Sequence, residues 1–167
     1  MARRAFTLIE LIMVMLIMGI ISVVGFIVIN PYQGIKLDAA AKKVMVDLEF
    51  ARNLSLSTAK WYGVSFEADP SNVYRVYQTD GVTDTVMDDP SQPGKSFVVN
   101  LNSYFGGVKI QSASLGGGSK VEFNPLGTPY ADKTGAAFSA NGVVTLSFNS
   151  PTKTVQITPN TGRIFVQ

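Results

Sequence analysis

Two residue types that often carry out chemistry are missing from this chain, which contains no histidine and no cysteine. Histidine is the commonest general base and a frequent metal ligand, and cysteine supplies thiolate nucleophiles and ligands. Their absence excludes Ser-His-Asp, Cys-His and zinc hydrolase chemistry as well as disulfide frameworks. Three features remain as candidate functional sites: Glu10 beside a long apolar run, an acidic segment at residues 79–94, and Arg163 near the carboxyl end. We expect no enzyme, no cofactor and no metal site.

Glu10 lies at the start of a segment that is apolar enough for a bilayer. The nineteen residues from Leu11 to Ile29 carry no charge, and a helix that rises about 1.5 Å per residue crosses a hydrocarbon core of about 30 Å with that length. Arg3 and Arg4 precede the segment, so the positive-inside tendency favours a cytoplasmic amino terminus. A secretory signal peptide fits less well, since its apolar run is shorter. A plain signal anchor fits the run but gives no reason for the carboxylate.

The sequence RRA followed by FTLIELIMVMLIMGII resembles the class III leader and first helix of type IV pilins and type II secretion pseudopilins. The resemblance implies that a prepilin peptidase cuts between Ala5 and Phe6 and methylates the new amine of Phe6. Glu10 would then pair with this cationic amine on a neighbouring subunit, because opposite charges attract most strongly in apolar surroundings. Two features depart from the family pattern: position 5 is alanine instead of glycine, and the apolar run contains Gly19 and Gly25 instead of a kinking proline.

A helical pattern resumes after an NPYQG interruption. Apolar or small residues recur at alternating steps of four and three, which predicts one narrow face that packs on the rest of the domain. These residues are Leu37, Ala41, Val44, Leu48, Ala51 and Ser55. The opposite face is predicted to be wet and carries Lys42, Asp47, Glu49 and Arg52.

From Trp61 onward, short alternating segments replace the helical period. Tyr62–Ala68 and Asn72–Gln78 are predicted to form a hairpin, and six further runs follow: SFVVNL, GVKIQ, KVEF, VVTLSF, TVQIT and RIFV. A long N-terminal helix followed by eight short strands predicts an α+β fold, in which the helix packs on an antiparallel, two-sheet β head. We therefore divide the chain into a leader at 1–5, a transmembrane and assembly helix at 6–30, a second helical half at 31–60 and a β-rich globular head at 61–167.

Three segments of the head are similar to the H-type minor pseudopilins of type II secretion and the related FimT minor pilins. They are the alanine-arginine step in LEFARNLSLSTAKWYGVSF, the phenylalanine-x-proline-x-glycine turn in VEFNPLGTPY, and the glycine-arginine strand in VQITPNTGRIFVQ. The resemblance implies a structural and assembly subunit of a type IV pilus or type II secretion pseudopilus, held in the inner membrane with its head in the periplasm. Its implied partners are the prepilin peptidase, other pilins or pseudopilins in a helical filament, and the inner-membrane assembly platform.

The acidic segment and a glycine-rich segment have alternative interpretations. The four aspartates of TDGVTDTVMDDPSQPG could bind calcium, but they lack the D-x-D-x-D-G order of a calcium loop. Aspartate beside glycine and proline is ordinary turn chemistry. The LGGGSK segment lacks the spacing of a phosphate-binding loop, which favours a hairpin turn.

Arg163 allows a different function, that of a membrane-tethered binding module such as a DNA-uptake receptor. FimT-type pilins of competence pili can bind DNA through a basic glycine-arginine tail. Here the apolar residues 164–166 follow Arg163, and one cation supplies little affinity for phosphates. A basic patch would need the lysines at 109, 120, 133 and 153 to gather near it, so we expect no nucleic-acid partner.

Overall fold

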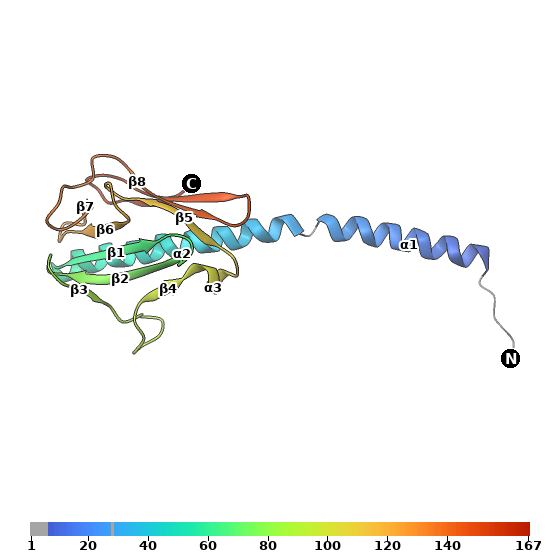
Figure 1. Ribbon diagram of the computed structural model, residues 1–167, viewed down its shortest axis with the longest axis horizontal. Helices are drawn as coiled ribbons and strands as arrows, with labels where there is room; N and C mark the ends of the chain where they lie inside the picture. The colour runs from blue at the N-terminus through green and yellow to red at the C-terminus, as the bar shows by residue number, and fades with distance from the viewer. Residues whose placement is uncertain (1–6, 28) are drawn as a thin grey trace. The chain divides into compact units, whose positions relative to one another are not determined.

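The computed structural model describes residues 7–27 and 29–167, without the side chains of residues 23–27, 29–31 and 33. The chain divides into two compact units, Met1–Ile35 and Lys36–Gln167, which Figure 1 draws as ribbons.

The first unit contains two helical segments. Helix α1 runs over Leu8–Ile27, and helix α2, Ile29–Thr58, begins in this unit. Pro31 lies in the first turn of α2 and has no N–H to donate to the carbonyl of Ile27, so it cannot extend the hydrogen bonding of α1. The NPYQG segment interrupts the helical pattern of the sequence, but it is itself helical, because a first turn tolerates proline.

In the second unit, α2 supplies one wall of the hydrophobic core. All six residues predicted for its packed face are buried, which confirms that face: Leu37, Ala41, Val44, Leu48, Ala51 and Ser55. The prediction of a wet opposite face is wrong at Asp47, which is 4% exposed. Asp47 lies three residues after Val44 and four before Ala51, so it borders the packed face.

The first sheet contains the predicted hairpin. β1 and β2 are antiparallel, with Val64 opposite Val76, and the strand order is β3-β2-β1-β6-β7, with β4 also pairing with β2. The strands are β1 (Trp61–Glu67), β2 (Val73–Thr79), β3 (Asp84–Val86), β4 (Val98–Asn100), β6 (Lys120–Phe123) and β7 (Pro129–Tyr130).

The second sheet has the order β10-β9-β8-β5, again with antiparallel neighbours. Its strands are β5 (Lys109–Ser114), β8 (Gly142–Ser147), β9 (Thr152–Ile157) and β10 (Ile164–Val166). Figure 1 shows the two sheets as separate layers of the second unit. One hydrophobic core contains residues from α2 and from both sheets. The predicted α+β fold with a two-sheet antiparallel head is confirmed.

Differences from the sequence prediction concentrate in residues 79–130. β3 and β7 were not predicted, and the SFVVNL segment ends in a short helix, α3 (Leu101–Phe105). Asn100 causes this change, because its side-chain oxygen accepts a hydrogen bond from the N–H of Ser103 (2.9 Å) and so caps the first turn.

Candidate assembly surface

The described part of α1 exposes apolar side chains on every side. Consecutive residues of a helix are about 100° apart, so a continuous run of exposed residues covers the whole circumference. A helix that is apolar all round is normally found inside a protein or a membrane. Exposed fractions lie between 47% at Val14 and 79% at Leu8 for Leu8, Ile9, Leu11, Ile12, Met13, Val14, Met15, Leu16, Ile17, Met18, Ile20 and Ile21.

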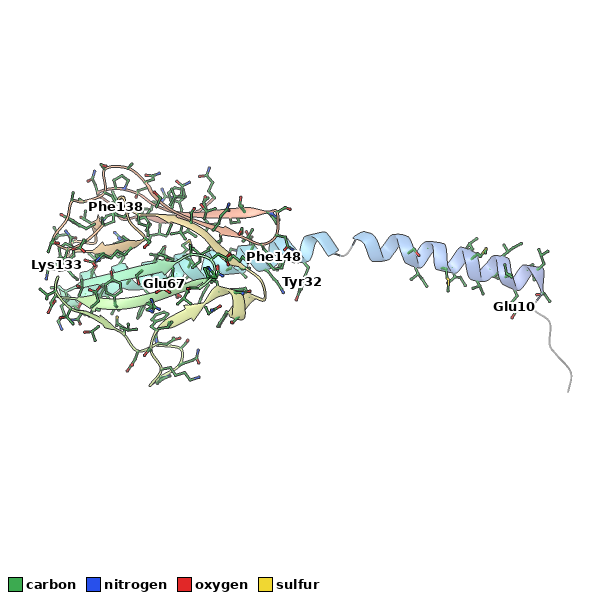
Figure 2. All side chains as sticks on the ribbon, viewed as in Figure 1. Glu10, Tyr32, Glu67, Lys133, Phe138 and Phe148 are labelled. Carbon is green, nitrogen blue, oxygen red and sulfur yellow. The ribbon has the colours of Figure 1, made fainter. Side chains whose placement is uncertain are left out.

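Glu10 is the one charged residue in this helix. Its side chain is exposed, and Figure 2 labels it near the amino-terminal end of α1. Its N–H donates to the carbonyl of Thr7 (3.1 Å), which places it in the first turn, where the helix dipole favours a carboxylate. Within the described part of the chain, Glu10 forms no ion pair. A cation for it must therefore come from outside the described residues or from another molecule.

Ala5 and Phe6, the predicted cleavage and methylation positions, lie outside the described residues. The predicted transmembrane segment at 6–30 is also described only in part. Among the residues that the structure describes, no helix has both the length and the apolar character needed to cross a bilayer. Cleavage, methylation and the pairing of Glu10 with the amine of Phe6 remain predictions.

Arg52 joins the three head segments that resemble H-type pseudopilins. Its Nε donates to the carbonyl of Gly127 (3.2 Å), and its Nη2 donates to the carbonyl of Thr161 (2.9 Å). The two turns also approach each other, since a Cβ on Gly162 would lie 2.3 Å from the carbonyl oxygen of Gly127. The prediction that Arg52 belongs to a wet face is therefore wrong: its half-buried side chain holds the end of α2 against both turns.

The lysines proposed for a basic patch already have partners. Arg163 is exposed just before β10. The four lysines contact carboxylates or a carbonyl, and these contacts reduce their attraction for phosphates. These contacts give little support for nucleic-acid binding. They are Lys109–Asp69 (3.3 Å), Lys120–Asp132 (2.5 Å), Lys153–Asp38 (2.7 Å) and Lys133 Nζ to the carbonyl of Asp80 (2.7 Å).

Two aspartates of the acidic segment stabilise turns. Asp80 Oδ1 accepts hydrogen bonds from the N–H groups of Val82 (2.8 Å) and Thr83 (2.7 Å). Asp89 Oδ1 accepts from the N–H (2.7 Å) and hydroxyl (2.6 Å) of Ser91. Across the described ranges, no three acidic side chains gather as they would around a metal ion. Both Asp80 and Asp89 therefore have a turn-forming role.

A buried carboxylate on β6 was missed by the sequence prediction. Glu122 accepts hydrogen bonds from the hydroxyl of Tyr77 (3.0 Å), the ammonium of Lys120 (3.0 Å) and the N–H of Lys133 (2.7 Å). Gly63 lies opposite it on β1, where a Cβ would be 2.6 Å from the Tyr77 ring and 2.9 Å from Glu122 Cγ. A glycine within an alternating strand was the available signal for this close packing.

Acidification is expected to remove stability that Asp132 contributes. Hydrogen bonds from Lys120 and Thr134 hold the pKa of the Asp132 carboxyl well below its ordinary value of 3.8. An acid with a lowered folded-state pKa stabilises the protein above its unfolded pKa, and this contribution is lost as the pH falls toward the folded-state value. Asp132→Asn should therefore lower the thermal midpoint at neutral pH, and the difference from the parent should shrink below pH 3.8. Thermal unfolding of the full chain in detergent measures both. The control is Asp88→Asn, and an unchanged difference at acid pH would contradict the assignment.

The amino-terminal segment matches a known family. Residues 1–26 match the family model described as the prokaryotic N-terminal methylation motif. A comparison of the whole chain with curated proteins gave no match.

Two crystal structures of the type IV minor pilin FimU from Pseudomonas aeruginosa are similar to this chain in fold. For the P65 crystal form the TM-score is 0.53 at 12% identity, covering 78% of this chain and 92% of that chain. For the P21 form the TM-score is 0.51 at 14% identity, covering 78% and 87%. The likeness confirms the fold class, and together with the methylation motif it supports the expected type IV pilin superfamily.

Proposed function

We propose that this chain, with the N-terminal methylation motif and the fold of the type IV pilin superfamily, is a minor pilin or pseudopilin. Its role is structural: it is a subunit that helps to assemble a type IV pilus or a type II secretion pseudopilus. The observation that carries the proposal is the apolar circumference of α1 with the single carboxylate of Glu10 in its first turn. Such a helix needs an apolar surrounding, and such a carboxylate needs a cation within it.

The proposed action has two stages. In the first, residues 6–30 hold the chain in the inner membrane, with the amino terminus in the cytoplasm and the head in the periplasm. In the second, the helix leaves the lipid and packs among similar helices of a filament. Both surroundings are apolar, so close packing and polar pairing supply the specificity.

Glu10 and Phe6 have the central role in the second stage. Cleavage after Ala5 by the prepilin peptidase exposes an amine on Phe6, and methylation leaves that amine cationic. In an apolar filament core, the amine of one subunit and the Glu10 carboxylate of another attract each other, and this attraction offsets the free-energy cost of burying the two charges. Because Glu10 occupies one position along the helix, this pair sets the stagger between neighbours. Head-to-tail contacts that do not close into a ring give an open helical fibre.

The subfamily is proposed to be the H-type pseudopilins and FimT-like minor pilins. Arg52 supports this assignment, because it hydrogen-bonds the Gly127 turn and the Thr161–Gly162 turn, the two other segments of the resemblance. The alternative of a tethered DNA-uptake receptor has less support, since Lys109, Lys120 and Lys153 are in ion pairs.

The mature amino terminus tests the proposal. Chain isolated from membranes of cells that contain a prepilin peptidase should begin with methylated Phe6, as read by mass spectrometry of the intact protein and its first peptide. Ala5→Gly should be cleaved at least as completely, because glycine is the usual residue before the cut, and Ala5→Leu should stay uncut because its side chain is larger. A chain that keeps residues 1–5 in all three cases would contradict the proposal.

A further inference from the structure

A cavity of about 250 Å³ lies beside β4 in the second unit. We call it the β4 pocket. Its volume falls just below the range of about 300–1,000 Å³ that is typical for small-molecule sites, so it suits a single side chain better than a cofactor. Its lining includes Lys43, Asp89, Ser91, Val98, Ser103 and Tyr104.

One wall of the β4 pocket is a hairpin at residues 88–96. β3 and β4 pair with the same edge of β2, and the chain between them leaves the sheet, as Figure 1 shows. Hydrogen bonds fix the base of the hairpin: Met87 N–H to the carbonyl of Val76 (3.0 Å) and Phe97 N–H to the carbonyl of Met87 (2.6 Å). The Phe97 side chain is buried in the core. The wall is therefore formed before any ligand arrives, which lowers the cost of binding.

Lys43 and Asp89 line the β4 pocket, and together with Asp47, which pairs with Lys43 from outside the lining, they carry one net negative charge. The ammonium of Lys43 lies 2.7 and 2.6 Å from the two oxygens of Asp47, which is therefore its nearest counter-ion. Asp89 is the other charged lining residue and is 8% exposed. Burial raises the pKa of its carboxyl, but hydrogen bonds from the hydroxyl and N–H of Ser91, together with the nearby charge of Lys43, hold that pKa below the ordinary 3.8. Exposed Lys95 lies outside the lining and donates to Gln92 (3.0 Å).

The rest of the lining adds apolar surface next to this carboxylate. Val98 is 43% exposed and Tyr104 is 63% exposed. An aliphatic wall and an aromatic ring beside a buried carboxylate suit a long side chain with an apolar stem and a cationic head. We propose that the β4 pocket receives a lysine or arginine side chain of a neighbouring filament subunit. The identity of the neighbour rests on the proposed function; the chemistry of the pocket does not.

Site-specific cross-linking tests this proposal. The chain contains no cysteine, so Ser103→Cys in the full chain gives one thiol at the pocket for a benzophenone maleimide probe. Illumination in cells that assemble filaments should join this position to a subunit segment that contains a lysine or arginine. Asp89→Asn should reduce that product about ten-fold or more, because it removes one member of a buried charge pair. Asparagine keeps an oxygen that can accept from Ser91.

The controls separate folding from binding. Asp88→Asn, at an exposed neighbour outside the lining, should leave the cross-link unchanged. If Asp89→Asn lowers the thermal midpoint, Tyr104→Ser becomes the deciding variant. Because the Tyr104 ring is exposed, its removal is expected to leave folding intact but to weaken the cross-link. A full yield with the deciding variant, or a product on a segment without a lysine or arginine, would overturn the proposal.

The same assay distinguishes this proposal from the proposed function. If Glu10→Ala blocks assembly while Asp89→Asn leaves the cross-link intact, only the β4 pocket proposal fails. If the parent chain is absent from sheared filaments while the cross-link still requires Asp89, the pocket binds a cationic side chain and the filament function fails.

Discussion

Glu10→Ala is expected to remove the chain from filaments while leaving it in the membrane. Removing one partner of a buried ion pair typically costs about 3–5 kcal/mol, because the other charge is left uncompensated. A loss of about 3 kcal/mol corresponds to a factor of more than about one hundred in an equilibrium. Insertion into lipid should not be weakened, because the substitution removes a charged residue from a membrane helix. Quantitative blotting of sheared filaments against the membrane fraction measures both.

Three variants show whether the charge and its position are responsible. Glu10→Gln keeps the size and polarity of the side chain, so it should also fail if the charge matters. Leu11→Ala, at an exposed apolar neighbour, should assemble nearly as well as the parent. Glu10→Ala combined with Leu11→Glu moves the carboxylate by about 100° around the helix and should not rescue assembly. Normal incorporation of the Gln variant would refute the ion pair.

The regular elements could be predicted from the sequence because their signals are local. The packed face of α2 follows from the helical period at positions such as Val44 and Leu48, and both are buried. The β1–β2 hairpin follows from two alternating segments that lie close together in the chain. Glu10 could be identified as a candidate site for a similar reason, because a single carboxylate beside an apolar run is recognisable without any knowledge of tertiary structure.

The remaining features depend on contacts that no local pattern encodes. Arg52 hydrogen-bonds Gly127 and Thr161, which lie 75 and 109 positions further along the chain. Its polarity alone therefore predicts a solvent-exposed side chain. Asp47 is buried because Tyr74, 27 residues away, donates a hydrogen bond to it. β3 and β7 are three and two residues long, which is too short for an alternation to be recognised.

The β4 pocket could not be predicted either, since it needs four segments at once. α2 contributes Lys43, the 88–96 hairpin contributes Asp89, and β4 and α3 contribute Val98 and Tyr104. In the sequence, Asp89 is one of several aspartates beside proline and glycine and has the appearance of a turn residue. Its turn role is real, and only the fold, which brings α2, β4 and α3 to the same pocket, gives it a second environment.

The largest expected effect on stability comes from Gly162→Ala. Gly162 has a φ of +61°, and an added Cβ would lie 2.3 Å from the carbonyl oxygen of Gly127 and 3.0 Å from Nε of Arg52. The left-handed backbone costs about 1–2 kcal/mol for alanine, and forcing a methyl group into close packing costs about 1–3 kcal/mol. Moving the carbonyl away from Arg52 also weakens a hydrogen bond to a charged group, worth about 1.5–3 kcal/mol.

The combined loss for Gly162→Ala is about 3–6 kcal/mol, a large part of the 5–15 kcal/mol that stabilises an ordinary domain. At about 2–4 °C per kcal/mol for a chain of this size, the thermal midpoint should fall by about 6–24 °C. Gly117→Ala is the matched control, because Gly117 also has a positive φ, +94°, but its added Cβ meets nothing within 4 Å. Equal losses in the two variants would show that backbone conformation alone requires glycine at 162. A larger loss at 162 would assign the difference to the contact between the two turns that Arg52 holds together.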